Sequence, residues 1–521
     1  SLSAKASGLQ VTGYGGDPGS GARITIRGNS TIQGDNQPLI VIDGQPISNQ
    51  TFEQGVAGVQ QQSRLNDLNP QDIASVEVLK GASAAALWGS RAQSGVILIE
   101  TKKGRYDSKT DVTFSSSVRI DQQNQSQDLQ EAYGQGVAGR FSRGTSLSWG
   151  DRIADREGGQ DEFVDTDLVA VGQQTGQEYR PVIAGSAENP HGGKNSRETY
   201  DHSTRLFETG TLFENSLSVS GGGDNSRFFL SLGHTNQSGI IPANSNYERT
   251  SIRVNAERQI SDKLSIRGNA NYIKTNSDRV QQGSNIDGLL LGAYRTPADF
   301  NNADYTVNRY PDGRDGAVLE GLHRSFNGGV LGAVGQSGNP TGPGYANPRF
   351  TFNNTTNHSI VNRIVGQVET NYDPLAWLNF TARAGVDTYS DRRNAFFPVY
   401  SAGNPSGAQE EQEFSEYRVN VDVIGRATRP ITDEINSSLT LGFNFNHQEF
   451  DEVDVDLNNF SNPVEVRSLG NAAASDVSGF LDQSTERTAS VYGELRFDLY
   501  DQLFLTGTGR VDRASTFGPE A

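Results

Sequence analysis

From about Thr110 onward, apolar and polar residues alternate along the chain with a period of two. In segment 436–446 the apolar side chains are Leu439, Leu441, Phe443 and Phe445. The positions between them include Ser438, Thr440, Asn444 and Asn446. Because successive side chains of a strand point to opposite faces of a sheet, this pattern predicts strands with one apolar and one polar face.

The alternation predicts eleven strands, at about 110–121, 214–222, 226–235, 248–260, 263–274, 357–372, 377–390, 416–429, 435–450, 484–499 and 503–513. The connections between consecutive strands are alternately long and short. The long ones are expected at about 122–213, 236–247, 275–356, 391–415 and 451–483. A transmembrane β-barrel has long loops on one side and tight turns on the other, whereas a soluble sandwich gains nothing from that arrangement. The pattern therefore favours a mainly β, antiparallel transmembrane barrel, with a soluble all-β protein as the alternative.

An odd number of strands does not close a single-chain bacterial barrel, because such barrels have even strand counts. An open sheet in lipid would also leave a row of unpaired amides along its edge. We therefore expect these strands to be part of a larger barrel whose remaining strands lie outside this sequence.

The first 105 residues have a different texture, with short apolar strands set between glycines. The strands are expected at 23–28, 39–44, 73–81 and 95–104. An Ala-rich helix is expected at 82–88, between two glycines. The sequence thus predicts an N-terminal α+β domain at 1–105, followed by part of a barrel at 106–521.

Composition narrows the possible functions. The chain has 521 residues, of which 34% are hydrophobic, and it contains no Cys. It has no apolar run of about 18 residues, which excludes membrane-spanning helices, and without Cys it forms neither disulfides nor thiolate metal sites. The formal charge of −18 argues against a nucleic-acid partner, which would require a basic surface. In a transmembrane barrel only every second side chain of a strand faces lipid, so a low fraction of hydrophobic residues is compatible with a membrane protein.

Several segments resemble a known family. Residues 19–32 (GSGARITIRGNSTI), 37–47 (QPLIVIDGQPI) and 68–104 (LNPQDIASVEVLKGASAAALWGSRAQSGVILIETKKG) are similar to the plug domain of TonB-dependent outer-membrane transporters. Residues 206–255, which begin LFETGTLFENSLSVSGGG, and 510–519 (RVDRASTFGP) resemble the SusC/RagA branch of that family. The positions that carry the plug signature are Arg27, Gly28, Asp43, Gly44, Lys80, Gly81, Gly89, Gly95 and Thr101.

The resemblance implies active import of a large nutrient, an oligosaccharide or a peptide, through a barrel of about 22 strands around a plug. It also implies that residues 106–521 are the first half of that barrel. It implies as partners a SusD-like lipoprotein lid, and TonB-ExbB-ExbD acting through a segment that precedes residue 1. It also implies a dimer of importer–lid pairs, no enzymatic activity and no cofactor. The polar lumen would hold the plug through solvated, exposed ion pairs worth about 0–1 kcal/mol each. A non-transporting barrel that anchors surface lipoproteins or an extracellular assembly is the alternative.

The remaining candidate sites lie in the predicted loops. Asp451, Asp454 and Asp456 form an acidic cluster whose oxygens suit calcium, although a solvated charged loop has the same composition. The six His residues show no metal-ligand spacing, and no catalytic group can be assigned. Candidate cargo contacts are the loop aromatics, which stack on sugars and peptide side chains but also pack loops together. They are Trp149, Tyr294, Tyr305, Tyr310 and Phe326. In the plug, Asp43-Gly44 and Lys80-Gly81 are expected to be turns with positive φ at the glycine.

Overall fold

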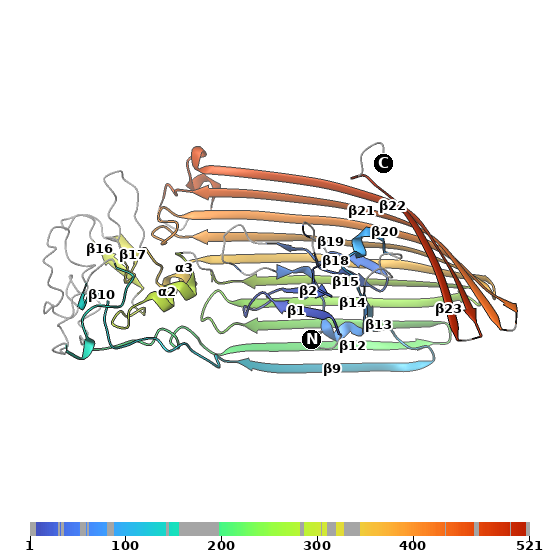
Figure 1. Ribbon diagram of the computed structural model, residues 1–521, viewed down its shortest axis with the longest axis horizontal. Helices are drawn as coiled ribbons and strands as arrows, with labels where there is room; N and C mark the ends of the chain where they lie inside the picture. The colour runs from blue at the N-terminus through green and yellow to red at the C-terminus, as the bar shows by residue number, and fades with distance from the viewer. Residues whose placement is uncertain are drawn as a thin grey trace.

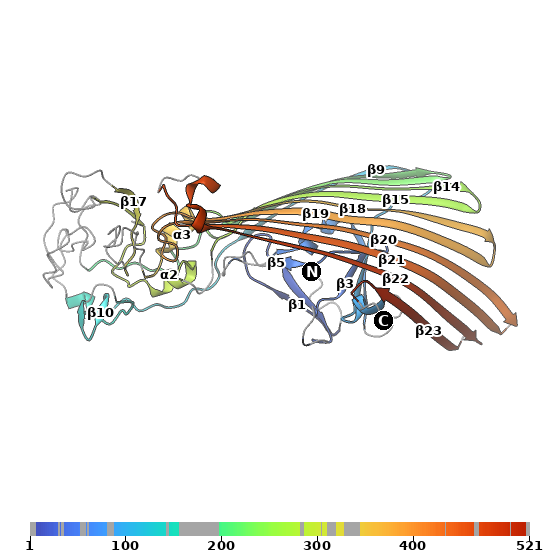
Figure 2. The same cartoon turned by 90° about the horizontal axis from the view of Figure 1, so that it is seen from above.

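A computed structural model describes residues 7–29, 32, 36–52, 59, 62–80, 88–141, 145–155, 197–281, 286–303, 305–309, 319–327, 344–432, 434–462, 468–500 and 502–516. In this part of the chain, one large curved sheet encloses a small N-terminal domain on its concave side (Figures 1 and 2). The connections at one end of the sheet form a separate mass beyond the strand ends.

The large sheet is an antiparallel meander of eleven strands in which each strand pairs with its neighbours in sequence. The strands are β9 (Ser108–Asp121), β12 (Gly210–Gly223), β13 (Ser226–Ser238), β14 (Asn246–Ser261), β15 (Leu264–Asp278), β18 (Thr356–Leu375), β19 (Leu378–Phe397), β20 (Ala408–Thr432), β21 (Ile435–Asn458), β22 (Val477–Leu499) and β23 (Leu503–Ala514). Every strand that the alternation predicts overlaps one of them, so this prediction is confirmed.

The connections of the sheet alternate in length, as the sequence predicts. The short ones are 224–225, 262–263, 376–377, 433–434 and 500–502, and the long ones are 122–209, 239–245, 279–355, 398–407 and 459–476. Two long connections are shorter than the expected 391–415 and 451–483, because β19 to β22 continue past their predicted ends. The added part of β20 is mostly polar, so apolar alternation did not reveal it. In β21 the residues Val453, Val455 and Leu457 continue the alternation, and the prediction ended that strand too early.

The long connections carry the small elements β10 (Gly136–Val137), β11 (Arg140–Phe141), α2 (Leu289–Arg295), β16 (Thr306–Arg309), β17 (Leu319–His323) and α3 (Pro348–Asn354), with 3-10 turns η4 (Ile153–Asp155), η6 (Leu469–Asn471) and η7 (Ala474–Asp476). Figure 1 shows most of them gathered at the left, beyond the ends of β12 to β15. A buried apolar cluster that includes Leu206, Ile241 and Leu289 joins segments from three of these connections.

The N-terminal domain contains a four-stranded mixed sheet with the order β4-β3-β8-β7. Its strands are β3 (Leu39–Ile42), β4 (Gln45–Ile47), β7 (Ile73–Leu79) and β8 (Val96–Thr101). Two-stranded pairs flank it, formed by β1 (Leu9–Gly13) with β2 (Ala22–Ile26) and by β5 (Thr51–Phe52) with β6 (Gln62–Ser63). The described part of this domain also contains three 3-10 turns: η1 (Arg64–Asp67), η2 (Pro70–Asp72) and η3 (Gly89–Ala92).

The four strands expected in this domain overlap β2, β3, β7 and β8. The expected helix at 82–88 lies outside the described residues, apart from Trp88. The domain's apolar core includes Ile24, Ile40, Ile97 and Ile99, and it extends to Val365 of β18. The N-terminal domain therefore packs directly against the large sheet.

The two faces of the large sheet differ in polarity. On β14, Ile252 and Val254 are exposed on the convex face, whereas Arg253 and Asn255 are buried against the N-terminal domain. On β21, Leu439, Leu441 and Phe443 are likewise exposed, while Asn444 is buried. A convex apolar band and a polar interior are the pattern of a sheet that borders lipid.

No helix in the described part of the chain is long and apolar enough to cross a membrane.

Candidate functional site

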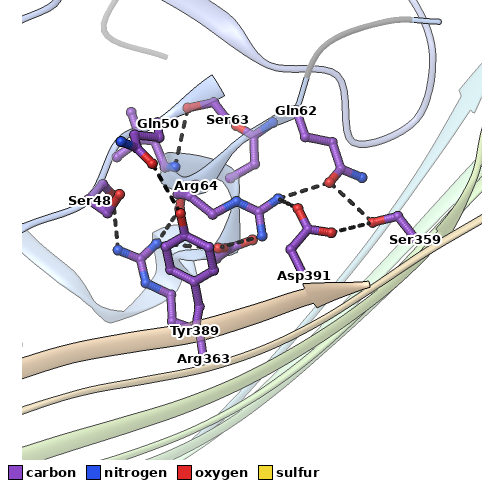
Figure 3. A network of polar contacts seen from close by, with 12 residues as sticks. Ser48, Gln50, Gln62, Ser63, Arg64, Ser359, Arg363, Tyr389 and Asp391 are labelled. Atoms are coloured by element: carbon purple, nitrogen blue, oxygen red, sulfur yellow. Dashed lines mark hydrogen bonds and ion pairs between the residues drawn. The ribbon is translucent and has the colours of Figure 1, made fainter. Parts of the chain in front are cut away.

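The interface between the N-terminal domain and the concave face is built around Arg363 of β18 (Figure 3). Its Nε and Nη2 donate to the two carboxylate oxygens of Asp387, both at 2.8 Å. Its Nη1 donates to the carbonyl oxygen of Arg64 at 2.7 Å, and its Nη2 to that of Ser48 at 2.9 Å. One guanidinium therefore joins two neighbouring strands of the sheet to two segments of the N-terminal domain.

Arg64 extends this network from the N-terminal domain toward the sheet. Its guanidinium lies 3.6 Å from carboxylate oxygens of both Asp67 and Asp391, and its Nη2 donates to Oε1 of Gln62 at 2.8 Å. The guanidinium also lies 5.7 Å from the ring centre of Tyr389. Asp391 in turn pairs with Arg393 at 2.8 Å. Cations and carboxylates thus alternate across the interface, so that each buried charge has a partner of opposite sign.

The charged side chains of this network are buried. Arg64, Arg363, Asp387 and Asp391 are each at most 1% exposed. The expectation of solvated, exposed ion pairs is therefore wrong here, because the curved sheet packs directly on the N-terminal domain. Breaking one partner of a buried pair costs about 3–5 kcal/mol, compared with about 0–1 kcal/mol for an exposed pair.

A second contact brings three plug-signature residues together. The Asp43 carboxylate accepts hydrogen bonds from the Thr101 backbone N at 2.9 Å and from its Oγ1 at 2.6 Å. Nη2 of Arg253, on β14, donates to the same carboxylate at 2.8 Å. Gly44 has φ +94°, as expected for the turn, and its α-carbon faces the guanidinium of Arg383 on β19. The β3–β4 turn is thus a contact point with the large sheet.

The other signature residues occupy turns and close contacts. Arg27 and Gly28 form an exposed turn after β2, with φ of 59° and 86°. Gly89 lies against Arg510 of β23, and Gly95 packs on Ile26. Nζ of Lys80 donates to Oγ of Ser7 at 3.4 Å, within the N-terminal domain. Gly81 lies outside the described residues.

The mass of long connections contains a small cleft of about 70 Å³. It is lined by Tyr200, His202, Arg205, Leu206, Asn301, Asn302, Ala303, Pro348 and Arg349. The buried His202 ring contacts the carbonyl oxygen of Pro297 through Nε2 at 3.1 Å and the Asn302 amide through Nδ1 at 3.2 Å. Burial lowers the pKa of His202, so the ring is neutral at pH 7 and accepts from Asn302. The cleft offers guanidinium and amide donors.

Sequence reasoning missed both the cleft and the individual members of the buried network. The cleft residues come from three segments, around 200, 302 and 348, so no local spacing connects them. Arg363 and Asp387 each lie on the polar face of a predicted strand. Many other polar residues do so too, so this position alone does not single them out. Only the folded sheet distinguishes those that contact the N-terminal domain.

The predicted cargo aromatics have different environments, and none of those described lines the cleft. Trp149 is 64% exposed and lies 6.4 Å from the Tyr133 ring. Phe326 is buried and stacks on Tyr345 at 6.1 Å, which favours a packing role. Tyr294 and Tyr305 are half-buried. Tyr310 lies outside the described residues.

The acidic cluster is split between two faces of β21. Asp454 and Asp456 share one face, whereas Asp451 lies on the opposite face because side chains alternate along a strand. Glu410 of β20 joins the first two, and carboxylate oxygens of these three residues lie within 4.8 Å of one another.

Comparison with known proteins shows which proteins this chain is similar to. Residues 1–96 match the family described as the TonB-dependent Receptor Plug Domain. Over 305 residues, 58% of this chain, the sequence is 30% identical to TonB-dependent receptor SusC of Bacteroides thetaiotaomicron, covering 25% of that relative. Over its whole length it is 25% identical to TonB-dependent receptor P26 of Formosa agariphila, covering 45% of it. The chain thus spans less than half the length of these curated relatives.

A solved structure of the RagAB peptide importer in the open-open state superimposes on the whole chain with a TM-score of 0.70. The sequences are 20% identical, and the match covers 53% of that chain. At this identity the similarity establishes the fold, a transmembrane barrel with a plug domain, as predicted. The relatives named here are receptors or importers by description, in agreement with the expectation that the chain is not an enzyme. Residues 1–96 therefore match the plug domain of TonB-dependent receptors, and the chain as a whole is similar to such receptors of the bacterial outer membrane, SusC among them.

Proposed function

We propose that this chain supplies the plug, residues 1–105, and barrel strands, within residues 106–521, of an importer driven by TonB. The cargo would be a large nutrient, an oligosaccharide or a peptide, taken up with a SusD-like lipoprotein as the lid. The observation that carries this proposal is the plug itself: a separate domain fills the concave face of the sheet and is held there by polar contacts rather than by an extended apolar interface. Such a domain obstructs the lumen, and passage requires it to move.

The chemistry of the interface suits a plug that must move and return. Each contact in the Arg363 and Arg253 networks is directional and paired, so the plug has one well-defined position. When the plug shifts, water can reach the separated charges and replace their hydrogen bonds, whereas large separated apolar faces would have no such compensation. A pull from the N-terminal side would reach the plug through β1, which pairs with β2 along Leu9–Gly13.

The proposal on cargo and partners rests on relatives. One similar structure is described as a peptide importer, and SusC is described as a TonB-dependent receptor. The small cleft among the long connections, with guanidinium and amide donors, would suit a single carboxylate, carbonyl or hydroxyl group of such cargo. A dimer of importer–lid pairs is part of the same proposal.

A disulfide between plug and barrel tests the proposal, because the chain contains no Cys of its own. Asp72 of the plug and Ser231 of β13 are adjacent across the interface, since Asp72 Oδ1 and Ser231 Oγ are 2.6 Å apart. The full-length receptor carrying Asp72→Cys and Ser231→Cys would be produced in cells that lack other copies, and uptake of labelled oligosaccharides and peptides would be measured.

We expect uptake to stop when the disulfide forms and to recover on reduction, while each single Cys variant imports normally. Uptake that continues in the fully cross-linked protein would rule out movement of the plug relative to β13. A wild-type receptor that imports none of the tested cargo, with or without TonB, would favour the alternative of a non-transporting barrel.

A further inference from the structure

The ends of β20 and β21 next to the long connections 398–407 and 459–476 carry an oxygen-rich cluster on the concave side of the sheet. Glu410 lies opposite Asp456 in the strand pairing, and Gln412 lies opposite Asp454. Phe414, two residues further along the same face of β20, is buried and contacts the guanidinium of Arg393. This face therefore looks into the barrel, and it lies beyond the apolar band that ends near Phe445.

Carboxylate oxygens of Glu410, Asp454 and Asp456 lie within 4.8 Å of one another. Glu452 and Asp482 are opposite each other in the pairing of β21 with β22, on the same face, and add negative charge nearby. Arg393, the neighbouring cation, pairs with Asp391 at 2.8 Å in the plug interface and also attracts Glu452, so it is shared between the plug interface and the cluster. Like charges this close repel, so a bound cation would stabilise the arrangement.

Gln412 supplies a second and independent observation. It is only 6% exposed, and its Nε2 donates to Oδ2 of Asp454 at 3.1 Å, so its carboxamide lies at the cluster. Its Oε1 and the other carboxylate oxygen of Asp454, Oδ1, are both buried without a hydrogen-bond partner. A buried oxygen without a donor is costly, and a cation satisfies it. A half-turn of the amide would direct Oε1 toward the carboxylates, which is favourable only with a cation between them.

The donor set identifies the class of ion. All four side chains offer oxygen, which hard cations prefer over nitrogen or sulfur ligands. Calcium binds oxygens at about 2.3–2.6 Å and accepts six to eight ligands in irregular geometry, completed by water. Two oxygens on opposite sides of such an ion are about 4.6–5.2 Å apart, which is compatible with the spacing here. Magnesium demands a smaller, regular octahedron.

We propose that Glu410, Gln412, Asp454 and Asp456 form a calcium site on the inner rim of the barrel. The ion would join β20 to β21 at the end where the two neighbouring long connections meet. There, backbone N of Asn459 already donates to the carbonyl oxygen of Gly407 at 3.1 Å. The site does not depend on the proposed import function.

Direct binding tests the site. Full-length receptor, purified in detergent and treated with chelator, would be titrated with Ca²⁺ by calorimetry and with Tb³⁺ by luminescence, and again with Mg²⁺. We expect Glu410→Gln and Asp456→Asn each to remove one equivalent of bound Ca²⁺ or to weaken its binding at least tenfold. Gln412→Leu should weaken it severalfold. Asp451→Asn is the matched control, because this carboxylate lies on the opposite face of the same strand, and it should bind like wild type.

The proposal fails if neither Glu410→Gln nor Asp456→Asn removes or weakens a Ca²⁺ equivalent that the wild-type receptor binds. It also fails if Asp451→Asn weakens binding as much as Asp456→Asn. Equal affinity for Mg²⁺ and Ca²⁺ would also overturn the assignment of the ion. Folding is checked by the shift in electrophoretic mobility between heated and unheated barrel. If one variant does not fold, the other carboxylate variant decides, since the two substitutions lie on different strands.

Discussion

The guanidinium of Arg363 donates hydrogen bonds to acceptors in both the large sheet and the plug. Its planar fork matches the Asp387 carboxylate, and the remaining N–H groups reach the plug carbonyls of Ser48 and Arg64. A lysine at this position would supply charge without the fork. The contact of barrel with plug therefore depends on the shape of this side chain as well as on its charge.

Replacing Arg363 with Ala should destabilise the barrel and its seated plug by about 3–5 kcal/mol, because Asp387 would keep a buried charge without a partner. Chemical unfolding of the full-length receptor, with hydrogen exchange of the plug amides, measures the effect. Arg119→Ala is the control: its pair with Asp121 is largely exposed, and we expect a change within about 1 kcal/mol. Equal effects of the two substitutions would contradict the assigned role of burial.

Alanine substitutions at Gly44 and Gly28 distinguish the effect of backbone strain from that of steric crowding. Both have positive φ, so Ala is strained at either position by about 1–2 kcal/mol. At Gly44 a Cβ would also lie 2.6 Å from the guanidinium carbon of Arg383, whereas at Gly28 it would meet open space. Gly44→Ala should therefore raise hydrogen exchange at the β3–β4 turn more than Gly28→Ala raises it after β2. The reverse order would show that Arg383 moves aside without cost.

At the scale of elements, His323 joins three parts of the mass of long connections. Its Nε2 accepts from backbone N of Asn347 at 2.8 Å, at the start of α3, and its Nδ1 donates to the carbonyl oxygen of Tyr400 at 3.2 Å. Its ring stacks on Phe350 at 3.9 Å. These hydrogen bonds require the neutral ring. Burial lowers the pKa of His323 to about 3, which matches that requirement.

Asp287 provides a link of opposite pH dependence in the same mass. Its Oδ2 accepts from backbone N of Gly403 at 2.9 Å, which ties the 279–355 connection to the 398–407 connection. Burial raises the pKa of Asp287 to about 6. Its proton is therefore held more tightly in the folded loops than in the unfolded chain.

The two groups predict opposite changes in loop stability with pH. As pH falls from 6.5 toward 3, His323 binds a proton in the unfolded chain but not in the folded loops. The free energy of unfolding of the loops therefore falls by about 1.4 kcal/mol per pH unit. As pH rises from 3.8 to 6, the loops lose stability because the unfolded Asp287 ionises first. Hydrogen exchange of residues 344–355 across this range measures the sum.

Variants separate the two contributions. His323→Gln should remove the loss of protection at low pH, and Asp287→Asn should remove the loss between pH 3.8 and 6. The two pH profiles should therefore depart from wild type in opposite directions. Profiles that both run parallel to wild type would show that neither side chain is linked to the order of the loops.

At the scale of the whole molecule, the convex face defines the membrane band. On β21 the outward residues from Leu439 to Phe445 are apolar, and they are followed by His447 and Glu449. On β20, Val419 and Val423 belong to the same band. The polar face of the same strands contacts the plug. The alternation of apolar and polar residues therefore provides one face for lipid and one for the plug.

Leu441 is 57% exposed in the middle of this apolar run, so Leu441→Arg would place a charge in lipid. We expect a cost of about 2–4 kcal/mol, and about 0–1 kcal/mol for Ile431→Arg, which lies beside the turn at 433–434. Reversible unfolding in lipid vesicles measures both. A similar cost at the two positions would mean that the band is not centred on Leu441.

The sequence alone determined the strands, their faces and the alternation of long and short connections. These follow from a period of two and from turn residues, which are local properties of the chain. The plug turn at Asp43-Gly44 was also foreseen, because only a left-handed backbone position calls for that glycine. Family resemblance, carried by continuous segments, indicated the plug and the branch.

Only the tertiary structure decided which polar side chains act together. Arg363 meets Arg64 and Ser48, and Glu410 meets Asp456, because the sheet curves around the plug and because strands pair in one register. It also decided that the plug contacts are buried, that Asp451 is separate from Asp454, and that Phe326 packs inside the loops. The physical reason is that burial and charge pairing depend on distances in space between residues far apart in sequence, and a local pattern does not contain them.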